Sequence, residues 1–382
     1  ILFERRLIHM PKNVKLDSKV FENSFELPNP SLRSYFERVV QGQPDVYRTP
    51  FYKGKDVTEI LGQWMPHLDV LKKEWPTLWD FENDLAKKVG PMSVMKPLKQ
   101  REDDIDSYYD SILRESKPIP REAIDAVIKE WGRARGMRVR SQARTVDVMK
   151  KSTNSGSPFF RKRKVVLDKT LPCRLMRFND GSYTQMLPNG MNYDVCAILG
   201  WRGQEGGPKP SDVKQRVVWM FPFAVNVEEL RLYQVLIETA QKFNLVPAWV
   251  SMEAVDAAIT RLFDTKGPND LIVCTDFSKF DQHFNSDMSD CAKTILRELF
   301  THNHDAEYWF DYVFPIKYDI PLAFDWGKVR VGKHGMGSGS GGTNADETLT
   351  HRALQYEAAI SSGSVLNPNS MCLGDDGILS YP

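Results

Sequence analysis

The sequence lacks the features that mark membrane proteins, disulfide-rich secreted proteins and zinc-binding proteins. Its 382 residues contain no run of about 18 apolar residues, so a membrane-spanning helix is not expected. The five cysteines are odd in number, widely spaced and without a CxxC pair, which argues against a disulfide framework or a zinc site and fits a reducing compartment. A large excess of charge is also lacking. With a formal net charge of +1, any polyanionic partner must be held by local basic clusters.

The chain is long enough for two or three domains, and its composition is ordinary for a globular protein. Residues 1–10 resemble the scar of an expression tag, and the polar, Pro-rich residues 11–60 predict an extended N-terminal arm. Three tryptophans then lie within helical patterns, where we expect them to anchor a core: Trp64, Trp75 and Trp79. A helix is predicted after Pro120, since apolar residues follow there at helical spacing.

Basic residues are concentrated between Arg133 and Lys164, where Asp147 is the one acidic residue. A solvated basic face is the ordinary interpretation of such a run, and a phosphate-binding surface is the alternative that bears on function. The eleven basic residues are Arg133, Arg135, Arg138, Arg140, Arg144, Lys150, Lys151, Arg161, Lys162, Arg163 and Lys164.

Carboxylates occur at two points where a ligand could reach them. The apolar segment from Leu271 predicts a strand that ends at Asp276, with Asp281 five residues later and a helix beginning near Met288. Near the end of the sequence, "SMCL" and "GILSY" predict the strands of a hairpin whose turn is Gly-Asp-Asp, with Asp375 and Asp376 adjacent. Neighbouring carboxylates repel one another, so a crowded pair needs cations.

A glycine-rich loop separates the two carboxylate segments. Five of the eight residues from Gly335 to Gly342 are glycine, so the loop could approach a sugar-phosphate backbone closely. An amphipathic helix is predicted after Thr343. If the strand ending at Asp276 lies beside the hairpin, three carboxylates converge. Such a ligand set suits two Mg²⁺ or Mn²⁺ ions about 3.5–4 Å apart, the arrangement used for in-line phosphoryl transfer.

Five segments together resemble the motifs of viral RNA-dependent RNA polymerases, in the order G, F, A, B, C of that family. They are "STNSGSPFF" (residues 152–160), "KPSDVKQRVV" (209–218), "DFSKFD" (276–281), "SGSGGT" (338–343) and "GDD" (374–376). Within the family, "DFSKFDQ" and "GSGGTNADETLTHRALQY" look closest to picobirnavirus polymerases, relatives of the partitiviruses.

The resemblance implies an α+β fold shaped as a right hand, with a palm made of an antiparallel sheet backed by helices. It also implies a division of the chain: fingers over 61–225, palm with motif A over 226–299, a fingers insertion over 300–334, and palm with motifs B and C over 335–382. Motifs D and E and the thumb of the family would lie beyond residue 382, so we expect a longer natural protein.

The resemblance also assigns roles to residues. Asp276 and Asp375 would bind both metal ions, with assistance from Asp376. The residues implied to bind the nucleotide are Lys209, Lys214, Arg216, Asp281, Ser338, Gly339, Thr343 and Asn344. Those implied to bind RNA at the template entry are Ser155, Gly156, Arg161 and Lys162.

One position departs from the family pattern. Many positive-strand polymerases have Asn four residues after the motif B Thr, where it partners the second motif A Asp. Here Glu347 stands at that position, with Asn344 and Asp346 nearby, so the partner of Asp281 stays open.

The implied activity is template-directed RNA synthesis that replicates and transcribes a viral RNA genome. The implied partners are RNA template and product, NTPs and a viral capsid protein, without a membrane, in the virion interior and host cytoplasm. Two alternatives stay open. A reverse transcriptase would share the palm and its metal chemistry, although Leu373-Gly374 before the Asp pair and Asp281 are atypical of it. A non-catalytic RNA-binding protein would use the basic region 133–164 and need no metal.

Overall fold

The computed structural model describes residues 15–16, 18–36, 53–89, 96–204, 209–212 and 214–382. The chain divides into two compact units. The first comprises residues 1–32, 106–198 and 219–382, and the second comprises 33–105 and 199–218. Among the described helices, none combines the length and the apolar character needed to cross a membrane.

A three-stranded antiparallel sheet in the first unit holds the predicted carboxylates. Its strand order is β10 (Met371–Leu373), β11 (Asp376–Leu379) and β7 (Val273–Asp276). The hairpin of β10 and β11 closes with Leu373 opposite Asp376, so Gly374 and Asp375 form a two-residue turn. The predicted hairpin is therefore confirmed, and Asp376 is the first residue of a strand rather than part of the turn.

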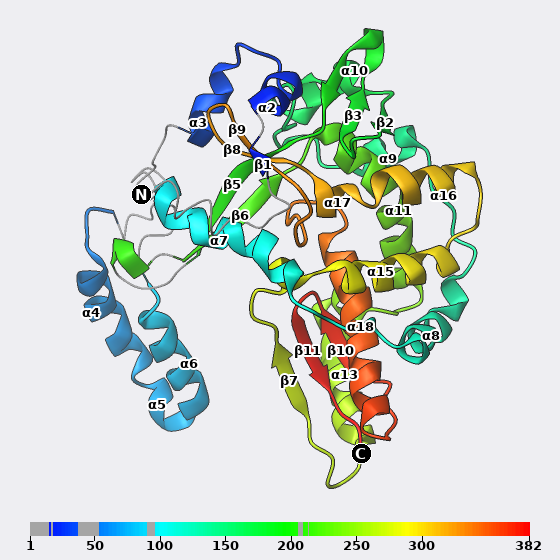
Figure 1. The fold of residues 1–382 in the computed structure, drawn as a ribbon. Helices are drawn as coiled ribbons and strands as arrows, with labels where there is room; N and C mark the ends of the chain where they lie inside the picture. Colours follow the sequence, from blue (N-terminus) through cyan, green and yellow to red (C-terminus); the bar gives the residue numbers. More distant parts are fainter. Residues whose placement is uncertain (1–14, 17, 37–52, 90–95, 205–208, 213) are drawn as a thin grey trace. The chain divides into compact units, whose positions relative to one another are not determined.

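Long and short helices pack against this sheet and against one another (Figure 1). Helix α18 (Thr343–Ser361) contacts β10, α15 (Ser286–Leu299) and α8 (Arg121–Glu130). Helix α12 (Pro247–Val250) contacts β10, α11 (Phe223–Lys242) and α13 (Met252–Thr265). The helices predicted after Pro120, near Met288 and after Thr343 are all present. An antiparallel sheet backed by helices is the predicted palm.

Helix α15 forms where the sequence supplies both a stripe of apolar residues and a residue that can cap the helix. Helix α15 begins after Asn285, whose side chain accepts a hydrogen bond from the Met288 amide, an N-cap that satisfies an otherwise unpaired donor. Its buried stripe recurs at helical spacing: Cys291, Ala292, Ile295, Leu296 and Leu299. Helix α18 is buried on more than one face, because β10, α15 and α8 surround it.

The rest of the first unit contains two further sheets. Strand β9 (Lys328–Val331) pairs antiparallel with β8 (Leu322–Asp325) and with β1 (Lys15–Leu16), and β8 pairs in parallel with the start of β5 (Ala197–Gln204). The antiparallel sheet β2-β3-β4 comprises Arg174–Arg177, Tyr183–Met186 and Asn192–Asp194. Short elements complete the unit: α2 (Ser18–Ser24), α9 (Gln142–Val148), α10 (Leu167–Thr170), α14 (Phe280–His283), α16 (His304–Tyr308), the π-helical turn η8 (Trp309–Val313) and α17 (Ile316–Asp319).

The described part of the predicted N-terminal arm contains the short strand β1 and the helix α2. Residues 18–24 form α2, in which Phe21 is buried, and Phe25 is buried immediately after it. The two rings meet edge to face, with centroids 4.8 Å apart. Burial of two aromatic side chains explains why this polar segment folds. Residues 37–52, also in the predicted arm, lie outside the described residues.

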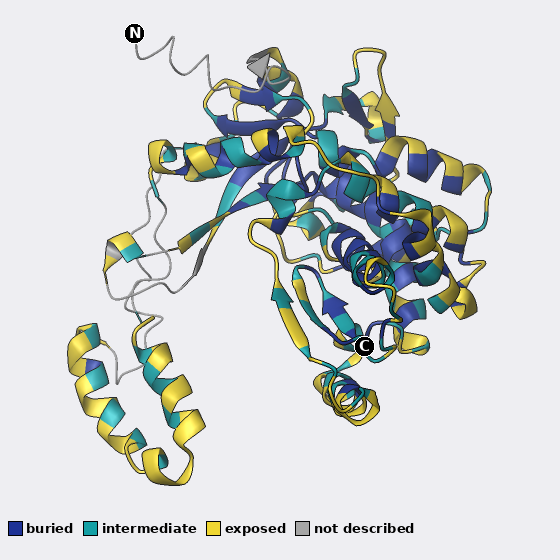
Figure 2. Cartoon of the chain, turned by 60° about the horizontal axis from the view of Figure 1, so that its bottom comes forward, coloured by how far each residue is buried: buried dark blue, intermediate teal, exposed yellow. Residues whose placement is uncertain are grey.

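The second unit corrects a prediction about the tryptophans. It contains α3 (Arg33–Phe36), α4 (Val57–Leu68), α5 (Leu71–Glu74), α6 (Pro76–Ala86), most of α7 (Leu98–Asp110) and most of the neighbouring strands β5 and β6 (Lys214–Met220). Trp64 is 49% exposed and Trp75 63% exposed, and Trp79 is only partly buried. They are therefore not core anchors, since three short helices enclose little volume. Figure 2 shows these helices mostly exposed, whereas buried residues concentrate in the first unit.

Candidate active site

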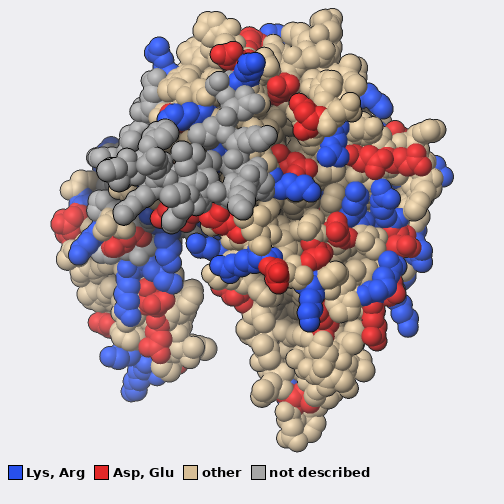
Figure 3. Space-filling view, in the orientation of Figure 1, with Lys and Arg blue, Asp and Glu red and all other residues tan. Residues whose placement is uncertain are grey.

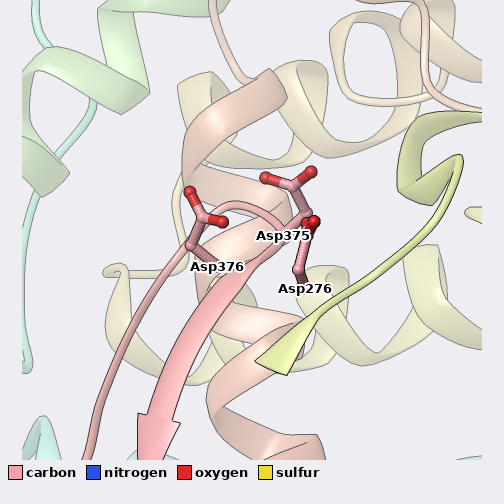
Figure 4. Close-up of side chains that lie close together, drawn as sticks. All are labelled: Asp276, Asp375 and Asp376. Carbon is pink, nitrogen blue, oxygen red and sulfur yellow. The ribbon is translucent and has the colours of Figure 1, made fainter. Parts of the chain in front are cut away.

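Three carboxylates meet at one end of the palm sheet. Asp276 is the last residue of β7, Asp375 lies in the β10–β11 turn, and Asp376 begins β11 (Figure 4). One ligand oxygen from each lies within 4.8 Å of the others. Asp276 is about 100 positions from Asp375 and Asp376 in the sequence, and the pairing of β11 with β7 brings them together. Three converging carboxylates form a hard oxygen donor set that fits Mg²⁺ or Mn²⁺.

The turn that carries Asp375 is held by buried polar groups of α18. Gly374 adopts a φ of +56°, a conformation that a side chain would strain, so the glycine suits the first position of this turn. Its amide donates to the Thr348 hydroxyl at 3.0 Å, and its carbonyl lies 2.8 Å from His351 Nδ1. The turn is therefore fixed to a buried helix, which positions the Asp375 carboxylate before any ligand arrives.

Electrostatics at the site favour a cation. Burial raises the pKa of Asp375, and the nearby carboxylates of Asp376, Asp276 and Asp281 raise it further. Like charges gathered at short range disfavour ionisation unless a positive charge compensates them. A divalent cation would supply that compensation, so the acidic cluster is better explained as a metal site than as a structural feature of the hairpin.

Asp281 has a hydrogen-bonded carboxyl partner, and it is Glu347. Asp281 lies on α14, five residues after Asp276, and is partly exposed. Glu347, on α18, is only 5% exposed, and its carboxyl group is hydrogen-bonded to Asp281. Burial, the hydrogen bond to Asp281 and the neighbouring negative charges raise the pKa of Glu347 to about 11. The raised pKa favours the protonated form of Glu347, which can donate to Asp281.

The other two candidates for this partner are engaged elsewhere. Asp346 accepts hydrogen bonds from Tyr233 and Tyr318 at 2.6 Å each, and it pairs with the buried Lys317 at 3.1 Å. Asn344 is exposed, and its side-chain oxygen accepts from the Trp249 ring nitrogen at 2.7 Å. Neither group contacts Asp281 in these interactions. The structure thus assigns the position that the sequence left open to Glu347.

The glycine-rich loop is packed closely against the protein itself. A Cβ on Gly339 would lie 1.8 Å from the Trp219 carbonyl oxygen, and one on Gly342 would lie 2.3 Å from the Tyr233 ring. The Ser338 hydroxyl is 3.0 Å from the Tyr108 hydroxyl. The glycines were predicted to allow a close approach to a sugar-phosphate backbone. At Gly339 and Gly342, the room that glycine gives is taken up by the protein.

A buried carboxylate fixes the far side of the same loop. Glu229 of α11 is fully buried and accepts hydrogen bonds from the Ser340 hydroxyl, from the Gly341 amide at 3.1 Å and from the Asn226 side chain at 3.1 Å. Thr343, at the start of α18, lies within 3.4 Å of the carbonyls of Gly337 and Ser340. Thr343 is thus positioned by the loop, in which its hydroxyl closes the last turn before the helix.

The residues predicted to bind RNA at the template entry differ in exposure. Ser155 and Gly156 are buried: the Ser155 hydroxyl accepts a hydrogen bond from the Arg161 amide at 3.1 Å, and the Gly156 amide donates to the Asn154 side chain. Arg161 and Lys162 are exposed. The buried pair shapes the loop, and the basic pair is available to phosphate.

The basic region 133–164 is partly structural. Arg140 pairs with Glu238, and Arg135 pairs with Glu298. Arg163 donates to Asn226 and lies over the Phe223 ring. On the face shown in Figure 3, Lys and Arg are interspersed with Asp and Glu rather than gathered into one field. Part of the charge of this region is therefore used in contacts within the protein.

Lys209, Lys214 and Arg216 are exposed and belong to the second unit. Lys214 and Arg216 lie on β6, where the alternation of buried and exposed residues puts both on one face.

Four residues near the site were not singled out from the sequence or were left undecided: Tyr108, Glu229, Glu347 and His351. Tyr108 and Glu229 carry no local motif, since their roles depend on contacts with residues more than 100 positions away. His351 is a buried side chain whose Nδ1 is hydrogen-bonded to the Gly374 carbonyl. Glu347 did carry a signal, because it stands four residues after Thr343, where many positive-strand polymerases have the Asn that partners the second motif A Asp.

The fold and the site together define a viral RNA-dependent RNA polymerase, and the chain belongs to this family. The family model for viral RNA-dependent RNA polymerases matches residues 208–382. The potential RNA-dependent RNA polymerase of human picobirnavirus is 61% identical over 363 residues, which is 95% of this chain and 67% of that protein. The RNA-directed RNA polymerase of Cryptosporidium parvum virus 1 is 26% identical over 266 residues, which is 68% of this chain and 49% of that protein.

Solved structures agree with this assignment. The crystal structure of the RNA-dependent RNA polymerase of a human picobirnavirus is 60% identical, with a TM-score of 0.88 over 95% of this chain and 69% of that one. An insertion-loop deletion mutant of a human picobirnavirus polymerase gives the same identity and TM-score, over 71% of its own chain. The chain thus spans about two thirds of the picobirnavirus protein and half of the Cryptosporidium virus protein. It is an RNA-directed RNA polymerase of the picobirnavirus type.

Proposed function

We propose that this chain joins ribonucleotides on an RNA template by two-metal nucleotidyl transfer, and so replicates and transcribes a viral RNA genome. The observation that carries the proposal is the convergence of Asp276, Asp375 and Asp376 at one end of the palm sheet. Two bound ions would stabilise the charge that develops on the attacking and leaving oxygens of the transfer.

The protein's own residues would bind and orient the reactants. Asp276 and Asp375 would hold the ions, and Asp376, opposite Asp276 in the sheet, would complete the acidic cluster. Lys209, Lys214 and Arg216 would bind the triphosphate, with Arg216 as a fork that fits phosphate oxygens. Ser338, Gly339, Thr343 and Asn344 would line the nucleotide, and Arg161 and Lys162 would contact template phosphates near the loop shaped by Ser155 and Gly156.

The partners in this proposal are RNA template and product, NTPs and, for genome packaging, a viral capsid protein. Its place of action would be the virion interior and the host cytoplasm, because a polymerase that copies a packaged RNA genome must meet that genome. The polymerase family of the relatives supports the first partners, and the capsid contact and the location rest on this reasoning alone.

Incorporation of labelled NTP on single-stranded RNA, with Mg²⁺ or Mn²⁺ and the intact polymerase, tests the mechanism. Asp375→Asn should reduce incorporation at least about 100-fold, or about 2.7 kcal/mol of barrier. Its unfolding midpoint should stay near wild type, since the change is isosteric. Asp264→Asn, an exposed position on α13, is the matched control. If Asp375→Asn still extends RNA at a tenth of the normal rate, the metal assignment is wrong.

A further inference from the structure

We propose that His351 is a positioning residue for the metal site: its ring donates a hydrogen bond to the Gly374 carbonyl and so fixes the conformation of the turn that carries Asp375. The inference rests on the proposed function and deepens it, because the role assigned to His351 is to set the affinity of the acidic cluster for a divalent cation. His351 lies on α18 and is 1% exposed, and it is not one of the three carboxylates that would hold the ions.

The turn between β10 and β11 leaves backbone groups outside the pairing of the strands. Leu373 and Asp376 are the last paired residues, so the amide and the carbonyl of the buried Gly374 need partners from elsewhere. Helix α18 supplies both. The Thr348 hydroxyl accepts from the Gly374 amide at 3.0 Å, and His351 Nδ1 lies 2.8 Å from the Gly374 carbonyl oxygen. Because a carbonyl oxygen can only accept, Nδ1 carries the hydrogen of this bond.

The hydrogen bond to this carbonyl decides between two conformations of the turn. Gly374 has a φ of +56°, and Asp375 is not among the described residues with a positive φ, which is the pattern of a type II′ turn. A type I′ turn needs a positive φ at both positions, and aspartate tolerates that conformation. The two types differ in the orientation of the peptide between the two residues, whose oxygen is the Gly374 carbonyl. By holding that oxygen, His351 selects one turn and with it the direction of the Asp375 side chain.

The His351 ring also contacts residues next to the other two carboxylates. The Phe277 ring, directly after Asp276 in the chain, meets it edge to face with centroids 4.9 Å apart. A Cβ on Gly377, directly after Asp376, would lie 2.8 Å from His351 Nε2, so the imidazole fills the space beside that glycine. Together with the bond to the turn, one imidazole therefore contacts a chain neighbour of every carboxylate in the acidic cluster.

Substitution can separate the hydrogen bond of His351 from the packing of its ring. A leucine has a similar volume and would still pack against Phe277, but it would leave the buried Gly374 carbonyl without its donor. An asparagine leaves part of the ring's volume empty, but it places an amide N–H near the position of Nδ1. A residue that only fills the core would be replaced better by leucine, and a residue that positions the turn would be replaced better by asparagine.

Binding of Mn²⁺ to the intact polymerase, followed by the electron paramagnetic resonance signal of the free ion, measures the affinity that His351 is inferred to set. In His351→Leu, the Kd for Mn²⁺ should rise at least about 10-fold, since apparent affinity falls with the fraction of molecules whose turn is in the binding conformation. His351→Asn keeps a donor, so its Kd should stay within about threefold of wild type. His304→Leu, at an exposed position on α16, is the matched control and should bind Mn²⁺ as wild type does.

Incorporation of NTP, measured well below the melting temperatures of all variants, gives the second readout. The loss of rate in His351→Leu should shrink as Mn²⁺ is raised, whereas Asp375→Asn lacks a ligand and should not recover. At a fixed, subsaturating Mn²⁺ concentration, His351→Asn should be at least about 5-fold faster than His351→Leu. Should the leucine variant fail to fold, His351→Gln takes its place, because its longer side chain carries the amide to the position of Nε2 rather than of Nδ1.

A Kd for Mn²⁺ in His351→Leu equal to that of wild type would overturn the proposal. An asparagine variant that binds Mn²⁺ as weakly as the leucine or glutamine variant would overturn the donor role. The proposed function fails differently: Asp375→Asn would then bind Mn²⁺ as wild type does, or would remain active. Mn²⁺ binding that depends on Asp375 but not on His351 would remove the positioning role alone and leave metal-dependent transfer intact.

Discussion

Asp376 lies directly opposite Asp276 in the antiparallel register between β11 and β7. The same register pairs Gly377 with Thr275 and Ile378 with Cys274. Because side chains alternate between the faces of a strand, a slip of one residue would turn the Asp276 carboxylate to the other face. The acidic cluster thus depends on the pairing of the strands as well as on the presence of the aspartates.

Metal binding should stabilise the folded chain measurably. We expect Mn²⁺ or Mg²⁺ to raise the melting temperature of the wild-type protein, by a stabilisation of about 2.7 kcal/mol at a hundredfold excess over Kd. Asp276→Asn should lose most of this effect, because one ligand and one charge are removed. Asp264→Asn is the control on an exposed helix surface and should keep it. Equal metal-dependent shifts in all three proteins would place the binding site elsewhere.

Binding of the NTP triphosphate should depend on the planar shape of the Arg216 side chain as well as on its charge. Arg216→Lys keeps the charge but loses the planar fork, so the apparent KM for NTP should rise about 10-fold with a smaller change in kcat. Steady-state incorporation across NTP concentrations measures this. Arg121→Lys, at an exposed position on α8, is the control and should leave KM unchanged. Indistinguishable kinetics for Arg216→Lys and wild type would exclude a bidentate phosphate contact.

Gly342 should tolerate no side chain, because the Tyr233 ring occupies the space. Tyr233 is fully buried, and its hydroxyl is bonded to Asp346 at 2.6 Å, so the ring cannot move aside. Gly342→Ala should therefore lower the free energy of unfolding by about 1–3 kcal/mol, the usual cost of overpacking. Gly132→Ala is the matched control, since nothing lies within 4 Å of its added Cβ. Urea unfolding of the two variants would contradict the packing argument if their midpoints were the same.

Acid should destabilise the protein through His334. This ring is 2% exposed and stacks on Trp219, and burial lowers its pKa from 6.5 to about 4, although the carbonyls of Gly335 and Ile320 favour the protonated form. Between about pH 6.5 and 4, the unfolded chain binds a proton that the folded chain does not. The free energy of unfolding should therefore fall as pH drops through this window, by about 3 kcal/mol in total.

The check compares the pH dependence of urea unfolding for wild type and His334→Gln between pH 7 and pH 4. The variant is less stable at neutral pH, but its stability should fall less steeply on acidification. Parallel curves for the two proteins would show that other groups cause the acid sensitivity.

Helices and turns could be predicted from the sequence where residues close together in the chain determine them. The apolar spacing of α15 and α18 and the glycine that begins the Gly374-Asp375 turn act within a few positions, so the helices and the hairpin could be predicted with their carboxylates. The tryptophans show the limit of this reasoning. Trp64 and Trp79 do lie in helices and Trp75 lies between two helices, but Trp64 and Trp75 are exposed, because burial depends on what packs against a helix and not on the helix itself.

The sequence by itself determined the order of the motifs, the strand that ends at Asp276, the hairpin that carries Asp375, and the family resemblance. Only the tertiary structure decided that Asp376 faces Asp276, that Glu229 holds the glycine-rich loop, and that Glu347 rather than Asn344 or Asp346 partners Asp281. The reason is physical. Turns and helices follow from short-range conformational preferences, whereas the pairing of buried polar groups depends on desolvation, which acts only after distant segments have packed together.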